Sequence, residues 1–232
     1  MGGAKSSSHF FSTEAASTPT RREAAWILDP RAFLAETNAA FRRPIFHMNE
    51  ELQVAIAAAR EAGALLREHF GKPLEVDQML AHDIKLALDV ESQALITARL
   101  LGAFPEHALY GEEGIAGHQA SEWQWIVDPI DGTVNYFYGI PHFCVSIALR
   151  RGEELQLGVI YDPMRDELWQ VEHGGQPTLN GQPIAVSTRT QLGDAMLSVG
   201  FAKSNSTIRS GLPLLAHYVQ RVRKCRMMGS AA

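Results

Sequence analysis

The sequence has few cysteines, no excess of positive charge and no long apolar run, and each shortage excludes a class of protein. Cys144 and Cys225 are the only cysteines among 232 residues, too few and too far apart for a disulfide framework, which favours a reducing compartment. The net charge of −5 argues against non-specific nucleic-acid binding, because that needs a basic surface. No apolar stretch approaches the roughly 20 residues of a membrane span. We therefore expect a cytoplasmic protein that contacts neither nucleic acid nor membrane.

Residues 1–47 differ in composition from the rest of the chain. They are rich in serine and threonine and contain no apolar core of a secretory signal. Asn49 can cap a helix whose first turn carries Glu50 and Glu51, which the helix dipole favours. We expect a disordered leader over residues 1–47 and a single domain over residues 48–232.

Apolar residues at helical spacing predict two helices before any strand. The first helix is expected from Asn49 to Phe70, where Gly71 and Pro73 end it. The second is expected over about Asp89–Leu101, with Asp89 as its cap and Gly102 at its end.

The apolar spacing then changes to that of strands. Strands are predicted at Trp123–Val127, Phe143–Leu149, Leu155–Tyr161, Leu168–Val171 and Met196–Val199. Asn180-Gly181 predicts a tight turn, and Leu214–Val222 a last helix with Pro213 near its first turn. Helices followed by antiparallel strands predict a layered α+β fold.

The segment Asp128-Pro129-Ile130-Asp131-Gly132-Thr133 is the most informative in the chain. Pro129 restricts the backbone, so both carboxylates and the Ile130 carbonyl can point at one place. Carboxylate and carbonyl oxygens suit Mg²⁺, and Gly132 permits close backbone approach. Thr133 can cap a helix whose amides face an anion. A capped surface turn is the simpler alternative, because Asp-Pro and Asp-Gly pairs are common in turns.

Two further acidic clusters precede this segment. Glu112-Glu113 lies between two glycines after a short apolar run, and Asp83 and Asp89 flank Lys85. Each cluster has an ordinary alternative, namely a solvated glutamate pair in the first case and a loop acid, a surface lysine and a helix cap in the second.

Together the three clusters resemble the inositol monophosphatase family, part of a wider superfamily of lithium-sensitive, Mg²⁺-dependent phosphatases. The resemblance runs from about Met48 to Ala232, and its most specific part is Trp125–Tyr136. The stretch Gly111–Gly114 is similar to the family's acidic loop, and Gly229–Ala232 to the beginning of a later helix. The resemblance implies the layered α/β/α/β sandwich of inositol monophosphatase and fructose bisphosphatase, with an incomplete C-terminal layer.

The resemblance also implies a reaction, in which water attacks the phosphorus of a small phosphate monoester in line with the help of two to three Mg²⁺ ions. It implies a first metal site at Glu112, Asp128 and the Ile130 carbonyl, and a second at Asp128 and Asp131. Glu112 and Thr133 would activate the water, and Asp83 would approach a third, looser metal ion. The implied contacts to phosphate or to the alcohol part of the substrate are Asp131, Gly132, Thr133, Gly229 and Ala231.

The sequence departs from the family in two places. The stretch Asp83–Asp89 lacks the family's threonine and contains Lys85, which could pair with Asp83, reach the phosphate or lie on the surface. Family members continue into a Trp-Asp segment that completes the second metal site, whereas this sequence ends at Ala232. A fragment, a truncated gene product and a segment supplied by a partner are the alternatives.

Several functions remain open at this stage. Inositol monophosphate is the first expected substrate, and histidinol phosphate or a sugar phosphate are the alternatives. A non-catalytic binding or regulatory homologue is the alternative from another class, and a homodimer is left open.

Overall fold

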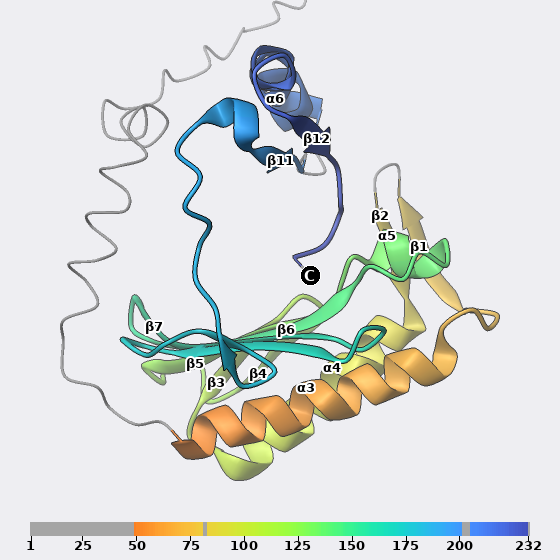
Figure 1. The fold of residues 1–232 in the computed structure, drawn as a ribbon. Coiled ribbons are helices and arrows are strands. Elements are labelled where there is room, and N and C mark those ends of the chain that lie inside the picture. Colours follow the sequence, from red (N-terminus) through yellow and green to blue (C-terminus); the bar gives the residue numbers. More distant parts are fainter. Residues whose placement is uncertain (1–48, 81–82, 201–204, 232) are drawn as a thin grey trace, which may run out of the picture. The chain divides into compact units, whose positions relative to one another are not determined.

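The computed structural model describes residues 49–80, 83–200 and 205–231 (Figure 1). The expected leader, residues 1–47, lies outside the described residues, as does Met48. Helix α3 (Asn49–His69) is the first described element and confirms the predicted first helix. Its small residues Ala55, Ala58, Ala59 and Ala62 are completely buried, so this face lets neighbouring elements approach closely.

The strands confirm the antiparallel hairpins predicted from the sequence. An eight-stranded sheet has the order β10-β9-β8-β7-β6-β5-β3-β4, and only the pair β3–β5 is parallel. Its strands are β3 (Ala108–Gly111), β4 (Gly114–Gly117), β5 (Trp123–Asp131), β6 (Cys144–Arg151), β7 (Glu154–Asp162), β8 (Glu167–Glu172), β9 (Thr178–Leu179) and β10 (Gln182–Pro183). The tight turn at Asn180-Gly181 is confirmed, because both residues have positive φ, 48° and 76°.

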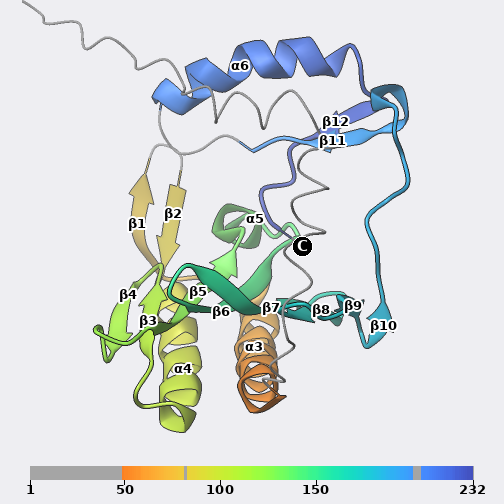
Figure 2. The same ribbon diagram turned by 90° about the vertical axis from the view of Figure 1, so that its left-hand side faces the viewer.

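Helices α3 and α4 (Ala87–Ala103) lie on the same face of this sheet (Figures 1 and 2). They pack against each other and, between them, against β3, β5, β6 and β7. Trp125, Ile147 and Leu149 are buried in the core on these strands. The predicted layered α+β fold class is confirmed by this helix layer and sheet.

The predicted bounds of the second helix are wrong at both ends. Helix α4 begins at Ala87, and its N-cap is Leu86 rather than Asp89. Asp89 instead lies in the first turn, where its carboxylate accepts the Leu86 amide at 2.8 Å, as in a capping box. The helix continues to Ala103, so Gly102 lies inside its last turn.

Some elements of the structure were not predicted or have other bounds than predicted. Strands β1 (Val76–Leu80) and β2 (Asp83–Leu86) form an antiparallel pair that was not predicted. Strand β11 (Met196–Ser198) is confirmed, and it pairs in parallel with an unpredicted strand, β12 (Lys224–Arg226). Helix α6 runs over Asn205–Val219 instead of Leu214–Val222, and Pro213 lies inside it. Asn, Ser and Thr at residues 205–207 favour this earlier start.

None of the helices within the described ranges is long and apolar enough to cross a membrane.

Candidate functional site

The two aspartates of the most informative segment lie at the end of β5, on a β-bulge. Asp128 pairs with Ser146 and Asp131 with Cys144, so β5 carries one residue more than β6 between these pairs. The Asp128 Oδ1 atom accepts the Ile130 amide at 3.2 Å across Pro129. The predicted bend is therefore present, but it is a bulge within β5 rather than a turn after the strand.

The short helix α5 (Thr133–Phe137) follows directly, and its cap corrects a prediction. Gly132, not Thr133, is the N-cap, with φ of 98°. Thr133 stands at the first helical position, and its Oγ1 donates to the Ile130 carbonyl at 2.9 Å. A Cβ atom at residue 132 would lie only 3.1 Å from the Gly229 carbonyl oxygen and 3.2 Å from that of His142. Glycine is thus required here by both conformation and space.

Buried aromatic contacts hold this junction on the helix layer. The Tyr136 hydroxyl donates to the Leu66 carbonyl of α3 at 2.8 Å. The Tyr136 ring also packs edge-on against Phe70 and Phe143, at centroid distances of 5.6 and 4.8 Å. The start of α5 is therefore fixed by the core rather than by a surface loop.

The acidic loop containing Glu112 reaches the same region through the parallel pair β3–β5. Gly111 pairs with Val127, and the Glu112 amide donates to the Val127 carbonyl at 3.1 Å. Glu112 is exposed, and its charge contributes to raising the pKa of Asp128. The structure therefore brings Glu112 and Asp128 into one electrostatic neighbourhood.

Negative charge is concentrated around this bulge. Burial, together with the charges of Glu112, Asp131 and Asp89, raises the pKa of Asp128 to about 7, and the hydrogen bond from the Ile130 amide opposes this rise. Burial likewise raises the pKa of Asp89 to about 7. Carboxylates whose ionised forms are destabilised in this way would be stabilised by a bound cation.

The structure adds Lys85, Glu113 and Gln93, which sequence reasoning did not assign to the site. The Lys85 Nζ atom lies 2.9 Å from both carboxylate oxygens of Glu113. The side-chain oxygen of Gln93 accepts the Glu113 amide at 2.8 Å, and its nitrogen donates to the Gly114 carbonyl at 3.2 Å. Gln93 is buried, which explains why Gly111 carries no side chain: a Cβ atom there would overlap the Gln93 amide.

A signal for Gln93 was present in the sequence. Asp89, Ser92 and Gln93 are polar residues on the buried face of α4 at spacings of three and four residues. Polar groups on a buried face need partners, so they mark a face that contacts a functional loop.

The segment 228–231 lies against Asp131. The Asp131 Oδ2 atom accepts hydrogen bonds from the Ser230 hydroxyl at 2.9 Å, from the Ala231 amide, and from the Cys144 thiol at 3.3 Å. Asn135 donates to both the His142 and Met228 carbonyls at 2.8 Å. Gly229 and Ala231 are thus brought beside Asp131 and Gly132.

One predicted catalytic residue, Asp83, begins β2, but its side chain is not among those that the structure describes. Cys144 is buried and Cys225 half-buried, and both are free thiols.

The donor atoms fit a hard divalent cation by their chemistry and charge. They are carboxylate oxygens and one backbone carbonyl, the ligands that Mg²⁺ prefers. Within the part of the chain that is described, no three His, Cys, Asp or Glu side chains form a ready-made metal cage.

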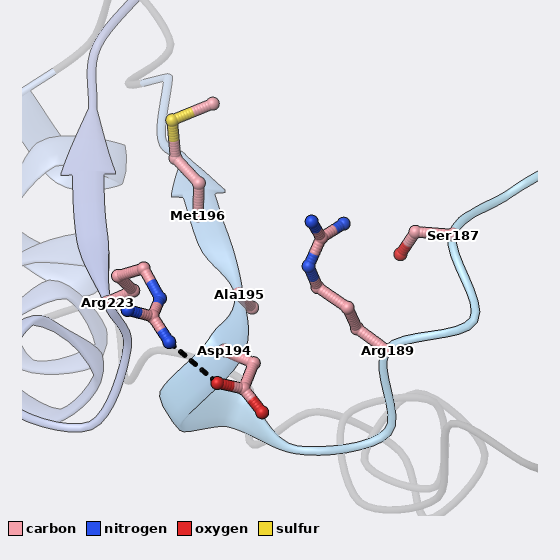
Figure 3. A pocket seen from close by; sticks show the side chains of 6 residues that line it. All are labelled: Ser187, Arg189, Asp194, Ala195, Met196 and Arg223. Atoms are coloured by element: carbon pink, nitrogen blue, oxygen red, sulfur yellow. Dashed lines mark hydrogen bonds and ion pairs between the residues drawn. The ribbon is translucent and has the colours of Figure 1, made fainter.

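One cavity lies away from the predicted site residues. It measures about 740 Å³ and is lined by Ser187, Arg189, Asp194, Ala195, Met196 and Arg223 (Figure 3). Arg223 donates to Asp194 at 2.7 Å, and both side chains are mostly exposed to solvent. Exposed charges are screened by water, so this cavity has weaker electrostatics than the bulge of β5.

The sequence profile described as the inositol monophosphatase family matches residues 47–232. The chain belongs to the inositol monophosphatase family. It is 37% identical over 191 residues to inositol monophosphatase 1 of Solanum lycopersicum, a match that covers 80% of this chain and 70% of the relative. It is also 36% identical over 185 residues to the Nus factor SuhB of Xylella fastidiosa, covering 78% of this chain and 66% of the relative.

Solved structures agree with this family. The extragenic suppressor protein suhB from Bartonella henselae matches with a TM-score of 0.72 and 33% identity, covering 78% of this chain and 70% of that one. An inositol monophosphatase from Thermotoga maritima matches with a TM-score of 0.68 and 32% identity, covering 78% and 69%. The fold of this family member is therefore that of the inositol monophosphatases.

Proposed function

We propose that residues 48–232 form a phosphatase domain that hydrolyses a small phosphate monoester, with inositol monophosphate as the first candidate substrate. Membership of the family supports phosphatase activity. The observation that carries the proposal is the concentration of charge at the β5 bulge, where Glu112 and Asp131 raise the pKa of Asp128. Such a site favours bound cations, and Mg²⁺ ions held there would in turn bind the anionic phosphate ester.

In this proposal Glu112, Asp128, Asp131 and the Ile130 carbonyl hold two Mg²⁺ ions, and a third binds more loosely near Asp83. Bound Mg²⁺ supplies positive charge for the phosphate oxygens and makes a water molecule more acidic. The Ile130 carbonyl has two lone pairs, so it can accept from Thr133 and still face a cation. Asp131 likewise has acceptor positions beyond those that Ser230 and Ala231 use.

Thr133 and Glu112 would orient the attacking water, and the Glu112 carboxylate would accept its proton. The Thr133 hydroxyl donates a hydrogen bond to the Ile130 carbonyl, so its oxygen lone pairs can accept a hydrogen bond from water. Glu112 lies on the exposed acidic loop beside Asp128, where its carboxylate can take the proton onward.

The phosphate and the alcohol of the substrate have separate contacts in this proposal. The first amides of a helix have no carbonyl partner within it, so those of Gly132 and Thr133 are suited to phosphate oxygens. Gly229 and Ala231, which lie beside Asp131, add further contacts, and Asp131 faces the alcohol group. Histidinol phosphate and sugar phosphates offer the same monoester and remain the alternative substrates.

The test is phosphate release by the purified 232-residue chain. We expect release from inositol monophosphate to require Mg²⁺, to stop in excess EDTA, and to be inhibited by Li⁺. Asp128→Asn should abolish it, whereas Asp77→Asn, an exposed aspartate on β1, should leave it unchanged. Full release in EDTA would contradict the metal-dependent mechanism. Histidinol phosphate and sugar phosphates assayed in parallel determine the substrate.

A binding or regulatory role is the second candidate, and the relatives named Nus factor SuhB favour it. The two candidates differ in one outcome. A chain that binds Mg²⁺ but releases phosphate from none of these esters would support the regulatory role.

A further inference from the structure

Lys85 is a positive charge placed inside the acidic site. Its ammonium nitrogen lies 2.9 Å from each carboxylate oxygen of Glu113, so both oxygens accept a hydrogen bond from it. The side chains of Lys85 and Glu113 are 31% and 11% exposed. Most of this pair is therefore shielded from water, and ionic interactions are stronger in such an environment than in water.

The ion pair is also mechanically anchored. Glu113 is held through its own amide by the buried Gln93 of α4, and Gln93 also binds the Gly114 carbonyl. Lys85 lies on β2. This strand ends at Leu86, the N-cap of α4, whose amide donates to the Asp89 carboxylate. The pair thus links β2 to the loop that carries Glu112.

An ordinary surface ion pair looks different in this chain. Lys72 and Glu68 are 54% and 70% exposed and 3.8 Å apart, on the end of α3. Such pairs contribute little, because water and salt screen them. Lys85 differs in burial, in its two equal contacts and in its position beside Asp89, on which its charge acts.

Charge balance shows what Lys85 contributes. Among the described side chains, Asp89, Glu112, Glu113, Asp128 and Asp131 act on one another electrostatically, and Lys85 acts on Asp89 among them. The Lys85 ammonium offsets one of these negative charges and repels any further cation that binds on its side of the cluster, so removal of its charge should make that cation bind more tightly.

We propose that Lys85 is a built-in cation of the acidic site, a positioning residue that fixes the Glu112-Glu113 loop and weakens the binding of a further divalent cation on its side of the cluster. The inference rests on the proposed function in one respect, that this cluster binds divalent cations. Lys85 compensates charge on the side of the cluster formed by Asp89 and Glu113. The binding of a third, loosely held divalent cation is therefore weakened in this chain.

The test is a titration of the full chain with Mn²⁺ alone, followed by calorimetry and by electron paramagnetic resonance of free Mn²⁺. The variants are Lys85→Met, which keeps the length of the side chain, Lys85→Arg, which keeps its charge, and the control Lys72→Met. We expect the most weakly bound Mn²⁺ ion to bind at least about tenfold more tightly in Lys85→Met than in the wild type, in Lys85→Arg and in Lys72→Met.

The double substitution Glu113→Gln with Lys85→Met covers the case in which Lys85→Met does not fold. Glu113→Gln alone leaves the Lys85 charge unbalanced and should weaken Mn²⁺ binding, and adding Lys85→Met should restore it. Equal Mn²⁺ binding by the wild type and Lys85→Met, or no restoration in the double variant, would overturn the inference while leaving the metal site intact. No Mn²⁺ binding by the wild type would overturn the metal site and the inference together.

Discussion

At the scale of single residues, the half-buried Asp128 and the buried His107 each lower the stability of the protein when they are charged, and they do so at different pH. Asp128 is costly when it is ionised, because burial and neighbouring carboxylates raise its pKa to about 7. His107 is costly when it is protonated, because burial lowers its pKa. The penalty for ionised Asp128 arises in the proposed active site, and the penalty for protonated His107 arises in the core.

Replacing Asp128 by Asn should stabilise the metal-free protein. The raised pKa means that the ionised form is disfavoured in the fold, so this penalty grows as pH rises through about 7. Asn keeps the shape without the charge, and we expect a gain of about 1–3 kcal/mol at pH 8 in EDTA. Thermal unfolding with and without Mg²⁺ measures this, with Asp77→Asn as the control. A loss of stability in EDTA would show that the carboxylate has favourable partners instead.

His107 should make the protein less stable in mild acid. It is 4% exposed and stacks between Phe104 and Trp123, at centroid distances of 5.1 and 5.7 Å. Its folded pKa lies below the unfolded value of about 6.5, so stability is present above that pH and is lost as pH falls further. Urea unfolding at pH 7.5 and 5.5 should show this loss in the wild type. His107→Phe should reduce it, and the exposed control His118→Phe should not.

At the scale of elements, the junction between β5 and α5 depends on a glycine in the left-handed region. Gly132→Ala should cost about 2–4 kcal/mol, from backbone strain together with crowding against segment 229–230. Gly139→Ala is the matched control, because Gly139 has φ of 70° and open space around its Cβ position. It should cost only about 1 kcal/mol. Equal losses in the two variants, measured by denaturant unfolding, would mean that contact with segment 229–230 is unimportant.

The sequence predicted those elements whose signals are local. The first helix, the hairpin β6–β7 and the turn at Asn180-Gly181 follow from periodicity and turn residues, and the structure contains them. The β1–β2 pair was not predicted, because Val76–Leu80 does not alternate polar and apolar residues. Pro213 predicts the first turn of a helix, yet it lies within α6. Tertiary context therefore outweighs the preference of proline for a helix start.

The candidate site follows the same division between local and distant signals. Asp128, Asp131 and Thr133 stand in one short segment, and the structure keeps them together. Gln93 and the Lys85–Glu113 pair depend on contacts between residues 20 and 28 positions apart. The polar face of α4 indicates that Gln93 needs a partner, but no local pattern identifies the partner. The cap of α5 was misassigned because Thr is a common N-cap, whereas the left-handed φ of Gly132 is visible only in the structure.

At the scale of the whole molecule, apolar side chains are exposed towards the C-terminal end of the sequence. No described residue of α6 is buried. The exposed apolar residues in this part of the chain include Val186, Leu192, Met196, Leu212, Leu214, Val219 and Met227. Large exposed apolar groups favour association, which agrees with the homodimer left open above.

We therefore expect concentration-dependent association in sedimentation velocity, with species larger than the 25.5 kDa chain. The double substitution Leu212→Glu with Leu214→Glu places charge on α6 and should shift the chain towards the monomer. Leu155→Glu, at an exposed position on β7, is the control and should have no such effect. A wild-type chain that remains monomeric at all concentrations would refute this prediction.

The hydrogen bonds from Ser230 and Ala231 to Asp131 join residues 99 and 100 positions apart. On the ribosome, Asp131 is therefore made well before its partners. At about 5–20 residues per second, the interval is roughly 5–20 s. Throughout it the nascent chain presents the acidic bulge without these donors. The site thus gains these donors only after residues 230 and 231 are synthesised, and a translational pause before residue 230 would prolong its exposure to chaperones and proteases.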